Sequence, residues 1–259
     1  MSDAGVDTRL MALQPEPTEP IYNQTEFFPT GKLPFAYRLG VSNDMRRALH
    51  AAAKESDVIH THSLWMMPNV YPEKAARGTS CAVVVSPRGT ISRWALRRSR
   101  VRKWCVWRMG QKRLLDAANC IHATCHDELQ DVRSLGLRNP VALVPNGVSC
   151  PVLPETPIHD QRSNRTVLFL ARIHPKKGVD TLLRAWRAIE SQFTDWNLKI
   201  AGPLGSDYSA QMIQLSSELQ LKRVNFVGEV TGPEKAQTFF DSDLYVLPTH
   251  SENFGISVA

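Results

Sequence analysis

Short runs of β-branched and apolar residues alternate along this chain with longer amphipathic segments. The runs lack the polar alternation of half-buried strands, so each is expected to be buried on both faces. They are predicted as strands at residues 57–60, 82–86, 119–123, 141–145, 166–171, 197–202, 224–228 and 243–248. Because the segments between them have helical periodicity, the sequence predicts an α/β fold of parallel strands joined by crossover helices.

A proline-bearing stretch separates the two groups of predicted strands. Residues 149–165, SCPVLPETPIHDQRSNR, contain three prolines and no periodicity. We therefore predict an N-terminal domain at 1–150, a linker at 151–165 and a C-terminal domain at 166–259. Each domain is expected to be Rossmann-like and to present the carboxyl ends of its strands to a shared cleft. Residues 14–43, rich in proline and aromatic residues, are expected to form a long functional loop.

Cysteine usage and the N-terminus predict a cytoplasmic protein. The five cysteines have no paired spacing, and the first residues show no basic and apolar signal pattern. Two metal sites remain open alternatives, one at His60 and His62 and one within the segment Cys120–His126, which holds two cysteines and two histidines. Strand packing is the preferred interpretation of both, and no metal is predicted.

Cations follow one predicted strand directly. Arg172, Lys176 and Lys177 lie just after 166–171, and Gly178 allows the backbone to turn into the next helix. Three cations at the carboxyl end of a strand suit an anion, and a diphosphate is the natural candidate. The alternative is a loop of solvated charges.

Glu252 occupies the corresponding place after residues 243–248. A helix is expected to begin at about Asn253 or Phe254, so that its N-terminus would face the same edge. A carboxylate there would accept hydrogen bonds from sugar hydroxyls or stabilise developing positive charge. The alternative is that Glu252 only complements the helix dipole.

Several segments, in order, resemble a known enzyme family. ARIHPKKGVDTLLRAW, LKIAGP, VNFVGEV and DLYVLPTHSENFGISVA resemble the second domain of family-4 retaining glycosyltransferases, which have the two-domain GT-B architecture. DVIHTHSLW and ALVPNGV resemble segments of that family's first domain. The resemblance implies a hexosyltransferase that moves a sugar from a nucleotide-diphosphate sugar to a glycan or lipid-linked acceptor with retention of configuration. It implies no cofactor, and a role in envelope polysaccharide or lipopolysaccharide biosynthesis.

The resemblance also implies roles for individual residues. Arg172 and Lys177 match the diphosphate-binding pair, with Gly178 beside them. Glu252 matches the first of two glutamates, the one that faces the transferred sugar and is the candidate catalytic residue. Phe254 and Gly255 match the segment whose backbone approaches the donor.

The chain also departs from the family pattern. The second glutamate would stand at position 260, and the first strand with its glycine-bearing loop is not recognisable, so both domains are expected to be incomplete and the fragment inactive. Arg88 stands where many relatives have a histidine. Together with His62, Arg88 is assigned to the acceptor or phosphate side; it cannot act as a general base.

Residues 93–113 hold nine Lys or Arg residues, three tryptophans and no acid. One interpretation of this tract is peripheral contact with an anionic membrane, at the inner face if the protein is cytoplasmic. A solvated basic face with tryptophans packed inward remains open, and nucleic-acid binding is not expected. Two rival functions also stay open: a nucleotide-sugar epimerase or hydrolase on the same scaffold, and a non-catalytic basic binding module.

Overall fold

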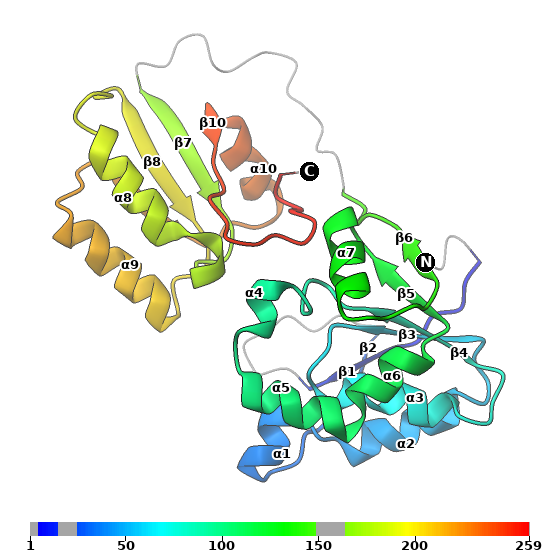
Figure 1. Cartoon of the computed structure of the whole chain (residues 1–259). Helices are drawn as coiled ribbons and strands as arrows, with labels where there is room; N and C mark the ends of the chain where they lie inside the picture. Colours follow the sequence, from blue (N-terminus) through cyan, green and yellow to red (C-terminus); the bar gives the residue numbers. More distant parts are fainter. Residues whose placement is uncertain (1–4, 15–24, 149–163, 259) are drawn as a thin grey trace. The chain divides into compact units, whose positions relative to one another are not determined.

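The computed structural model describes residues 5–14, 25–148 and 164–258. The chain divides into two compact units, Met1–Asn146 and Gly147–Ala259, which are seen in Figure 1. Most of the predicted linker, residues 151–163, lies outside the described residues. Each unit has its own hydrophobic core and is considered separately.

The first unit contains two sheets of parallel strands. The four-stranded sheet has the order β3-β4-β5-β6, and a second sheet pairs β1 with β2. The bounds are β1 Leu10–Leu13, β2 Thr25–Phe28, β3 Val58–His62, β4 Ala82–Ser86, β5 Cys120–Ala123 and β6 Val141–Leu143. Val83, Val85 and Ile121 point to a buried face of the larger sheet, as expected for strands covered by crossover helices.

Helices connect these strands as the sequence predicts. Their bounds are α1 Pro34–Leu39, α2 Asn43–Ala52, α3 Tyr71–Ala76, α4 Arg93–Leu96, α5 Arg100–Val106, α6 Lys112–Ala117 and α7 His126–Ser134, with a 3-10 turn at Met67–Asn69 and a π-helical turn at Trp107–Gln111. Helix α3 packs against β3, β4 and α6, and α7 packs against β5 and β6.

The prediction of one long loop over residues 14–43 is wrong in its described part. Strand β2 lies there, followed by α1. Pro34 occupies the start of α1, where its fixed φ suits a helix, and Gly40 ends it with φ 65°. Both signals were readable, but four and six residues are too short for periodicity to identify the elements.

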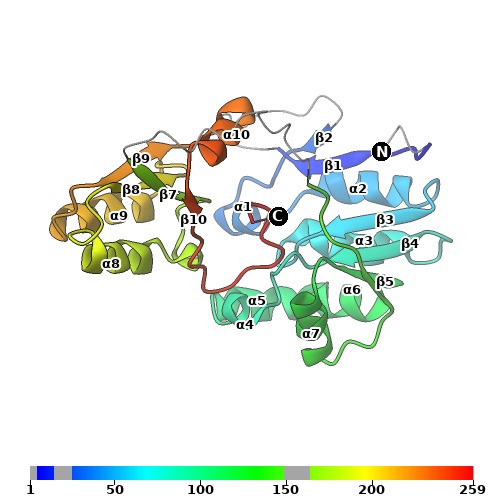
Figure 2. The same cartoon turned by 90° about the horizontal axis from the view of Figure 1, so that it is seen from above.

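The second unit has one parallel sheet with the order β10-β7-β8-β9. Helices α8 and α9 cover one face of this sheet and α10 lies on the other (Figures 1 and 2). The bounds are β7 Arg165–Leu170, α8 Val179–Ile189, β8 Trp196–Ala201, α9 Asp207–Glu218, β9 Val224–Gly228, α10 Gly232–Phe240 and β10 Leu244–Tyr245, with a 3-10 turn at Pro175–Lys177. The predicted parallel α/β fold class is therefore confirmed in both units.

The strand order of the second unit reverses at β7. Successive crossovers place β8 and β9 on one side of β7, whereas β10 lies on the other side. In open α/β sheets, ligands bind at the carboxyl ends of the two strands that flank such a reversal. The loops that leave β7 and β10 therefore mark the expected site.

Candidate functional site

The loops after β7 and β10 are held together by hydrogen bonds. The carbonyl oxygen of Lys176 accepts from the backbone N–H of His250 at 2.9 Å and from the hydroxyl of Thr249 at 3.0 Å. These contacts join the end of the 3-10 turn Pro175–Lys177 to the segment that follows β10, drawn in red in Figure 1. The two loops that flank the strand-order reversal are thus joined by hydrogen bonds.

Gly178 allows this close approach. Its φ is 68°, and a Cβ built on it would lie 2.1 Å from the carbonyl oxygen of Pro248. Any other residue at this position would therefore push the two loops apart as well as strain its own backbone. Gly178 also separates the 3-10 turn from α8, the turning role predicted for it.

Lys177 and Glu252 form an ion pair across these two loops. The ammonium group of Lys177 donates to Oε2 of Glu252, 75 residues away in the chain. The two side chains are 16% and 28% exposed, so the pair is partly screened from water and still reachable by a ligand. The pairing places Lys177, which is predicted to bind phosphate, beside Glu252, which is predicted to bind the sugar.

Further positive charge surrounds this pair. Burial lowers the pKa of Lys176; the Glu252 carboxylate opposes that effect, while Lys177 and Arg172 add to it. The Arg172 side chain is exposed. Three cations share the vicinity of one carboxylate here, and the excess of positive charge favours an anionic ligand.

The helix expected after Glu252 is absent from the described residues 251–258. A single hydrogen bond, from the Val258 N–H to the Gly255 carbonyl at 2.7 Å, closes one turn instead. Forming a first helical turn fixes several dihedral angles for one hydrogen bond, so an isolated turn is only marginally stable. The expected anion site at a helix N-terminus is therefore not formed in these residues.

Phe254 and Gly255 follow Glu252 closely. Gly255 has φ 70°, and a Cβ on it would lie 3.3 Å from Cγ of Glu252, so its backbone packs on that side chain. Phe254 is half-buried. The turn is attached to the sheet by Tyr245, whose hydroxyl donates to the Ser257 hydroxyl at 2.7 Å.

Arg88 and His62 lie together in the first unit. Nδ1 of His62 is 3.3 Å from Nη2 of Arg88 and 3.4 Å from its Nε. His62 ends β3 and Arg88 follows β4, so both stand at the carboxyl edge of the sheet. Arg88 also donates to the side-chain oxygen of Asn146, a residue that the sequence interpretation missed.

The two metal alternatives find no support in the described residues. His60 and His62 share a face of β3, with ring centroids 4.3 Å apart. Within residues 5–14, 25–148 and 164–258, no group of three or more His, Cys, Asp or Glu residues is placed to hold a metal ion.

The basic tract 93–113 forms α4, α5, the π-helical turn and the start of α6. Trp107 packs against the core and against Trp65, with ring centroids 6.2 Å apart. Trp104, by contrast, is 61% exposed, and the Arg108 guanidinium lies 5.3 Å from the centre of its ring. The open alternative in which all three tryptophans pack inward therefore fails at Trp104.

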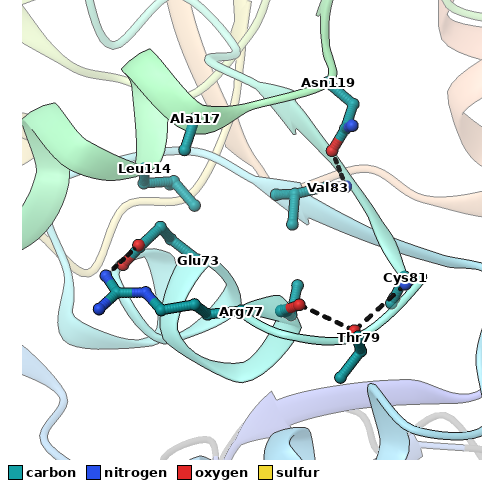
Figure 3. A pocket seen from close by; sticks show the side chains of 9 residues that line it. Glu73, Arg77, Thr79, Cys81, Val83, Leu114, Ala117 and Asn119 are labelled. Carbon is teal, nitrogen blue, oxygen red and sulfur yellow. Dashed lines mark hydrogen bonds and ion pairs between the residues drawn. The ribbon is translucent and has the colours of Figure 1, made fainter.

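A hollow lies near the start of β4, at the amino-terminal edge of the four-stranded sheet in the first unit. Figure 3 shows its lining, which includes Cys81, Leu114 and Asn119. Asn119 accepts from the Val83 N–H at 2.8 Å, and Thr79 bridges the Ala76 carbonyl and the Cys81 N–H. These polar groups serve the connection between α3 and β4, at the edge away from the strand ends where ligands bind.

Comparison with known proteins identifies the class. Residues 1–147 match the glycosyl transferase 4-like domain, and residues 158–259 match the glycosyl transferases group 1 family. The chain therefore belongs to the group 1 glycosyltransferases, as its resemblance predicts.

The similar proteins are distant. An uncharacterised glycosyltransferase of Haemophilus influenzae is 28% identical over 96 residues, 37% of this chain and 26% of that protein. D-inositol 3-phosphate glycosyltransferase of Mycobacterium tuberculosis is 28% identical over 161 residues, 57% of this chain and 33% of that protein. The matches thus span a third or less of these relatives.

Solved structures confirm the GT-B fold class. Sucrose-phosphate synthase from Thermosynechococcus elongatus has a TM-score of 0.67 at 19% identity, covering 95% of this chain and 66% of that one. HepE from Anabaena, in complex with UDP and glucose, has a TM-score of 0.65 at 18% identity, covering 88% and 62%. Among the described ranges, no helix has the length and apolar composition to cross a bilayer.

Proposed function

We propose that this chain carries the donor site of a retaining hexosyltransferase that uses a nucleoside-diphosphate sugar. The observation that supports it is the Lys177–Glu252 ion pair at the strand-order reversal of the second unit. A diphosphate matches the surplus of positive charge, and a sugar hydroxyl matches the carboxylate. The UDP and glucose in the Anabaena HepE structure support UDP as the first nucleotide to test.

The proposed chemistry follows from these charges. The acceptor oxygen forms a bond to the anomeric carbon, the bond to the diphosphate breaks, and the acceptor proton passes to the departing phosphate oxygen. Arg172 and Lys177 stabilise the negative charge that develops on that leaving group. Glu252 orients the sugar through its hydroxyls, so the reaction gains from positioning. No residue is assigned as a covalent nucleophile, and no cofactor is required by this scheme.

The acceptor is proposed to be a glycan or a lipid-linked sugar held by the first unit, where Arg88 and His62 stand at the strand ends. We assign the enzyme to the cytoplasm and to envelope polysaccharide or lipopolysaccharide synthesis. The unpaired cysteine spacing supports the compartment, and the family resemblance supports the pathway.

Donor binding is the direct test, measured by calorimetry with UDP and UDP-glucose. Lys177→Gln is expected to weaken the binding of UDP about 10-fold or more, because one charge-assisted hydrogen bond is lost. Lys222→Gln, an exposed lysine in the same unit, is the matched control and is expected to leave the affinity unchanged. Equal UDP affinities for the two variants would contradict the proposal.

Glu252→Gln separates the two halves of the donor. Because the carboxylate competes with phosphate for Lys177, its removal is expected to keep or improve UDP affinity. UDP-glucose is expected to gain less than UDP, since the carboxylate contact to the sugar is lost. An equal gain for both ligands would show that Glu252 does not face the sugar.

The two rival functions predict different results. An epimerase or hydrolase forms product without an acceptor, whereas a transferase requires one. A basic binding module would bind nucleic acid in a salt-sensitive way that survives Lys177→Gln.

We also propose that residues 93–113 contact an anionic membrane surface. Three apolar side chains stand exposed among the cations of this tract: Val101 at 78%, Trp104 at 61% and Met109 at 43%. Exposed apolar groups flanked by arginines suit the boundary between lipid headgroups and acyl chains.

Sedimentation with vesicles tests the membrane contact. The chain is expected to sediment with vesicles that contain phosphatidylglycerol and to stay in the supernatant with phosphatidylcholine alone. Trp104→Ser is expected to reduce sedimentation, whereas Phe193→Ser, at an apolar residue 46% exposed in the second unit, should not. Equal recovery in the supernatant with both vesicle types would contradict the proposal.

A further inference from the structure

Three neighbouring strands of the first unit bring basic rings together at their carboxyl ends. His60 and His62 lie on β3, and His122 lies on β5. Between them Ser86 ends β4, directly opposite His62 in the parallel register. The ring centroids of His60 and His122 are 5.5 Å apart. Arg88, 3.3 Å from His62, completes what we call the histidine–arginine cluster.

A directional chain of hydrogen bonds runs through this cluster. The Val144 carbonyl, which can only accept, lies 2.8 Å from Nε2 of His122 and therefore fixes the proton there. Nδ1 of His122 then accepts from the Ser86 hydroxyl at 2.9 Å. The Ser86 oxygen accepts in turn from Nε2–H of His60 at 2.7 Å. Because Ser86 is fully buried, both rings are held in one tautomer.

The groups of the cluster are all basic. Burial, and then the neighbouring His62, His122 and Arg88, together lower the pKa of His60 to about 4. Burial, then Arg88, then His122 lower the pKa of His62. His62 also uses Nδ1 to face Arg88, which has only donors, so the ring is neutral in this arrangement.

The nearby acid does not neutralise these groups. Glu128 of α7 is buried and accepts from the Gly89 N–H at 2.6 Å and from the N–H and hydroxyl of Thr124. Within the described part of the chain, no hydrogen bond or ion pair joins a carboxylate to His60, His62, His122 or Arg88. One fixed cation and three basic rings therefore share the strand ends, and no carboxylate of the described residues is hydrogen-bonded to them.

The backbone around the cluster is strained. Arg88 has φ 54° and is followed by Gly89 with φ 72°, while Ser63 and Trp65 after β3 have φ 68° and 74°. Left-handed conformations of residues other than glycine cost energy and concentrate at ligand sites.

We propose that the histidine–arginine cluster binds an oxyanion, a phosphate or carboxylate group, carried by the acceptor of the glycosyl transfer. The claim that the acceptor carries the anion rests on the proposed function, whereas the anion site itself does not depend on it. An oxyanion takes the N–H groups of Arg88, which frees Nδ1 of His62 to take up a proton. Anion binding and proton uptake are therefore coupled, and affinity rises as the pH falls from 8 to 6.

Histidine NMR with inorganic phosphate tests the anion site. The chain is used with Lys177→Gln as background, so that phosphate binding in the second unit is weakened. Phosphate is expected to shift the ring signals of His60 and His62 and to raise the pKa of both, relative to chloride at equal ionic strength. Absence of these shifts would overturn the proposal.

Three variants locate the site. Arg88→Gln is expected to weaken phosphate binding about 10-fold or more, and Arg88→Lys is expected to retain part of it, since charge remains but the planar fork is lost. Arg138→Gln, an exposed arginine of the same unit, removes the same charge and is expected to have little effect. Equal losses in Arg88→Gln and Arg138→Gln would overturn the proposal, and amide spectra check that each variant is folded.

Small acceptor analogues distinguish the sources of the anion. Glucose 6-phosphate and glucuronate are expected to shift the His62 signals and to be displaced by phosphate, whereas glucose should do neither. Whichever of the two charged ligands binds more tightly shows whether the site prefers a phosphate or a carboxylate. If glucose acts as strongly as both, the site does not select an anion. Because none of these measurements involves UDP, their outcome is independent of the donor-site tests.

Discussion

Gly178 shows how one residue controls the distance between two loops. Its left-handed backbone and missing Cβ let the Pro248 carbonyl approach within a distance that no side chain permits. That approach places Lys177 beside Glu252. The proposed donor site therefore depends on a residue that offers the ligand no charge.

Gly178→Ala is predicted to destabilise the second unit by about 1 to 3 kcal/mol, from the strained φ and the clash together. The substitution should also weaken the binding of UDP, because the two loops must separate. Chemical denaturation and calorimetry measure the two effects.

The matched control is Gly205→Ala, where a Cβ would meet nothing within 4 Å. Comparable losses of stability in the two variants would show that the close approach is not the cause.

At the scale of elements, α8 is anchored at its end by an acid. Leu182, Leu183 and Trp186 are buried on one face of the helix, whereas Ile189, which helical spacing places on the same face, is exposed. Glu190, the next residue, is buried instead. Its carboxylate accepts hydrogen bonds from the Lys222 N–H at 3.0 Å and the Arg223 N–H at 2.7 Å. Helix α8 is thereby joined to the chain entering β9.

Burial raises the pKa of Glu190, but the backbone N–H groups of Arg223 and Lys222 outweigh it, so the net pKa is lowered. A lowered folded-state pKa means that this stabilisation is present above the ordinary glutamate pKa and is lost as the pH falls from that value through the folded-state pKa.

Glu190→Ala is predicted to cost about 2 to 3 kcal/mol at pH 7, because it leaves two backbone donors without their charged acceptor. The difference from wild type should shrink below pH 4. Urea unfolding at both pH values measures it, with the exposed Glu218→Ala of α9 as control. A difference that does not change with pH would contradict the role of the carboxylate.

At the scale of the whole molecule, the two cores respond to acid through different groups. In the first unit His60 has a folded-state pKa of about 4, whereas the unfolded chain protonates near the ordinary value of about 6.5. Between these values the unfolded state binds more protons, so stability falls as the pH falls. In the second unit, Glu190 responds only at lower pH.

Lowering the pH from 7 to 5 is therefore predicted to reduce hydrogen-exchange protection in β3–β5 while sparing β7–β9. The loss should be less than about 1.4 kcal/mol per pH unit, since His60 is exposed to solvent. His60→Gln should remove most of the dependence. Uniform loss across both sheets would contradict this assignment.

The sequence by itself determined the parallel α/β class, because runs of apolar and β-branched residues and amphipathic helices leave local patterns. The expected burial on both faces fails for β3 and β9, which are exposed at alternate positions. The eight predicted strands all appear, with ends shifted by a few residues; 243–248 shortened most, to Leu244–Tyr245. Strand-end positions also predicted Arg172, Lys177, Glu252, Arg88 and His62 as candidates. Their roles in binding and transfer remain predictions.

Tertiary structure alone decided which candidates meet. The order β10-β7-β8-β9 brings Lys177 to Glu252 across 75 residues, and the pairing of β3, β4 and β5 brings the side chains of His60, Ser86 and His122 within hydrogen-bond distance. Strand order and register arise from contacts between segments far apart in the chain, and local periodicity carries no record of them. The turn after Glu252 was predicted as a helix because local propensity does not reveal whether a first turn will form and extend.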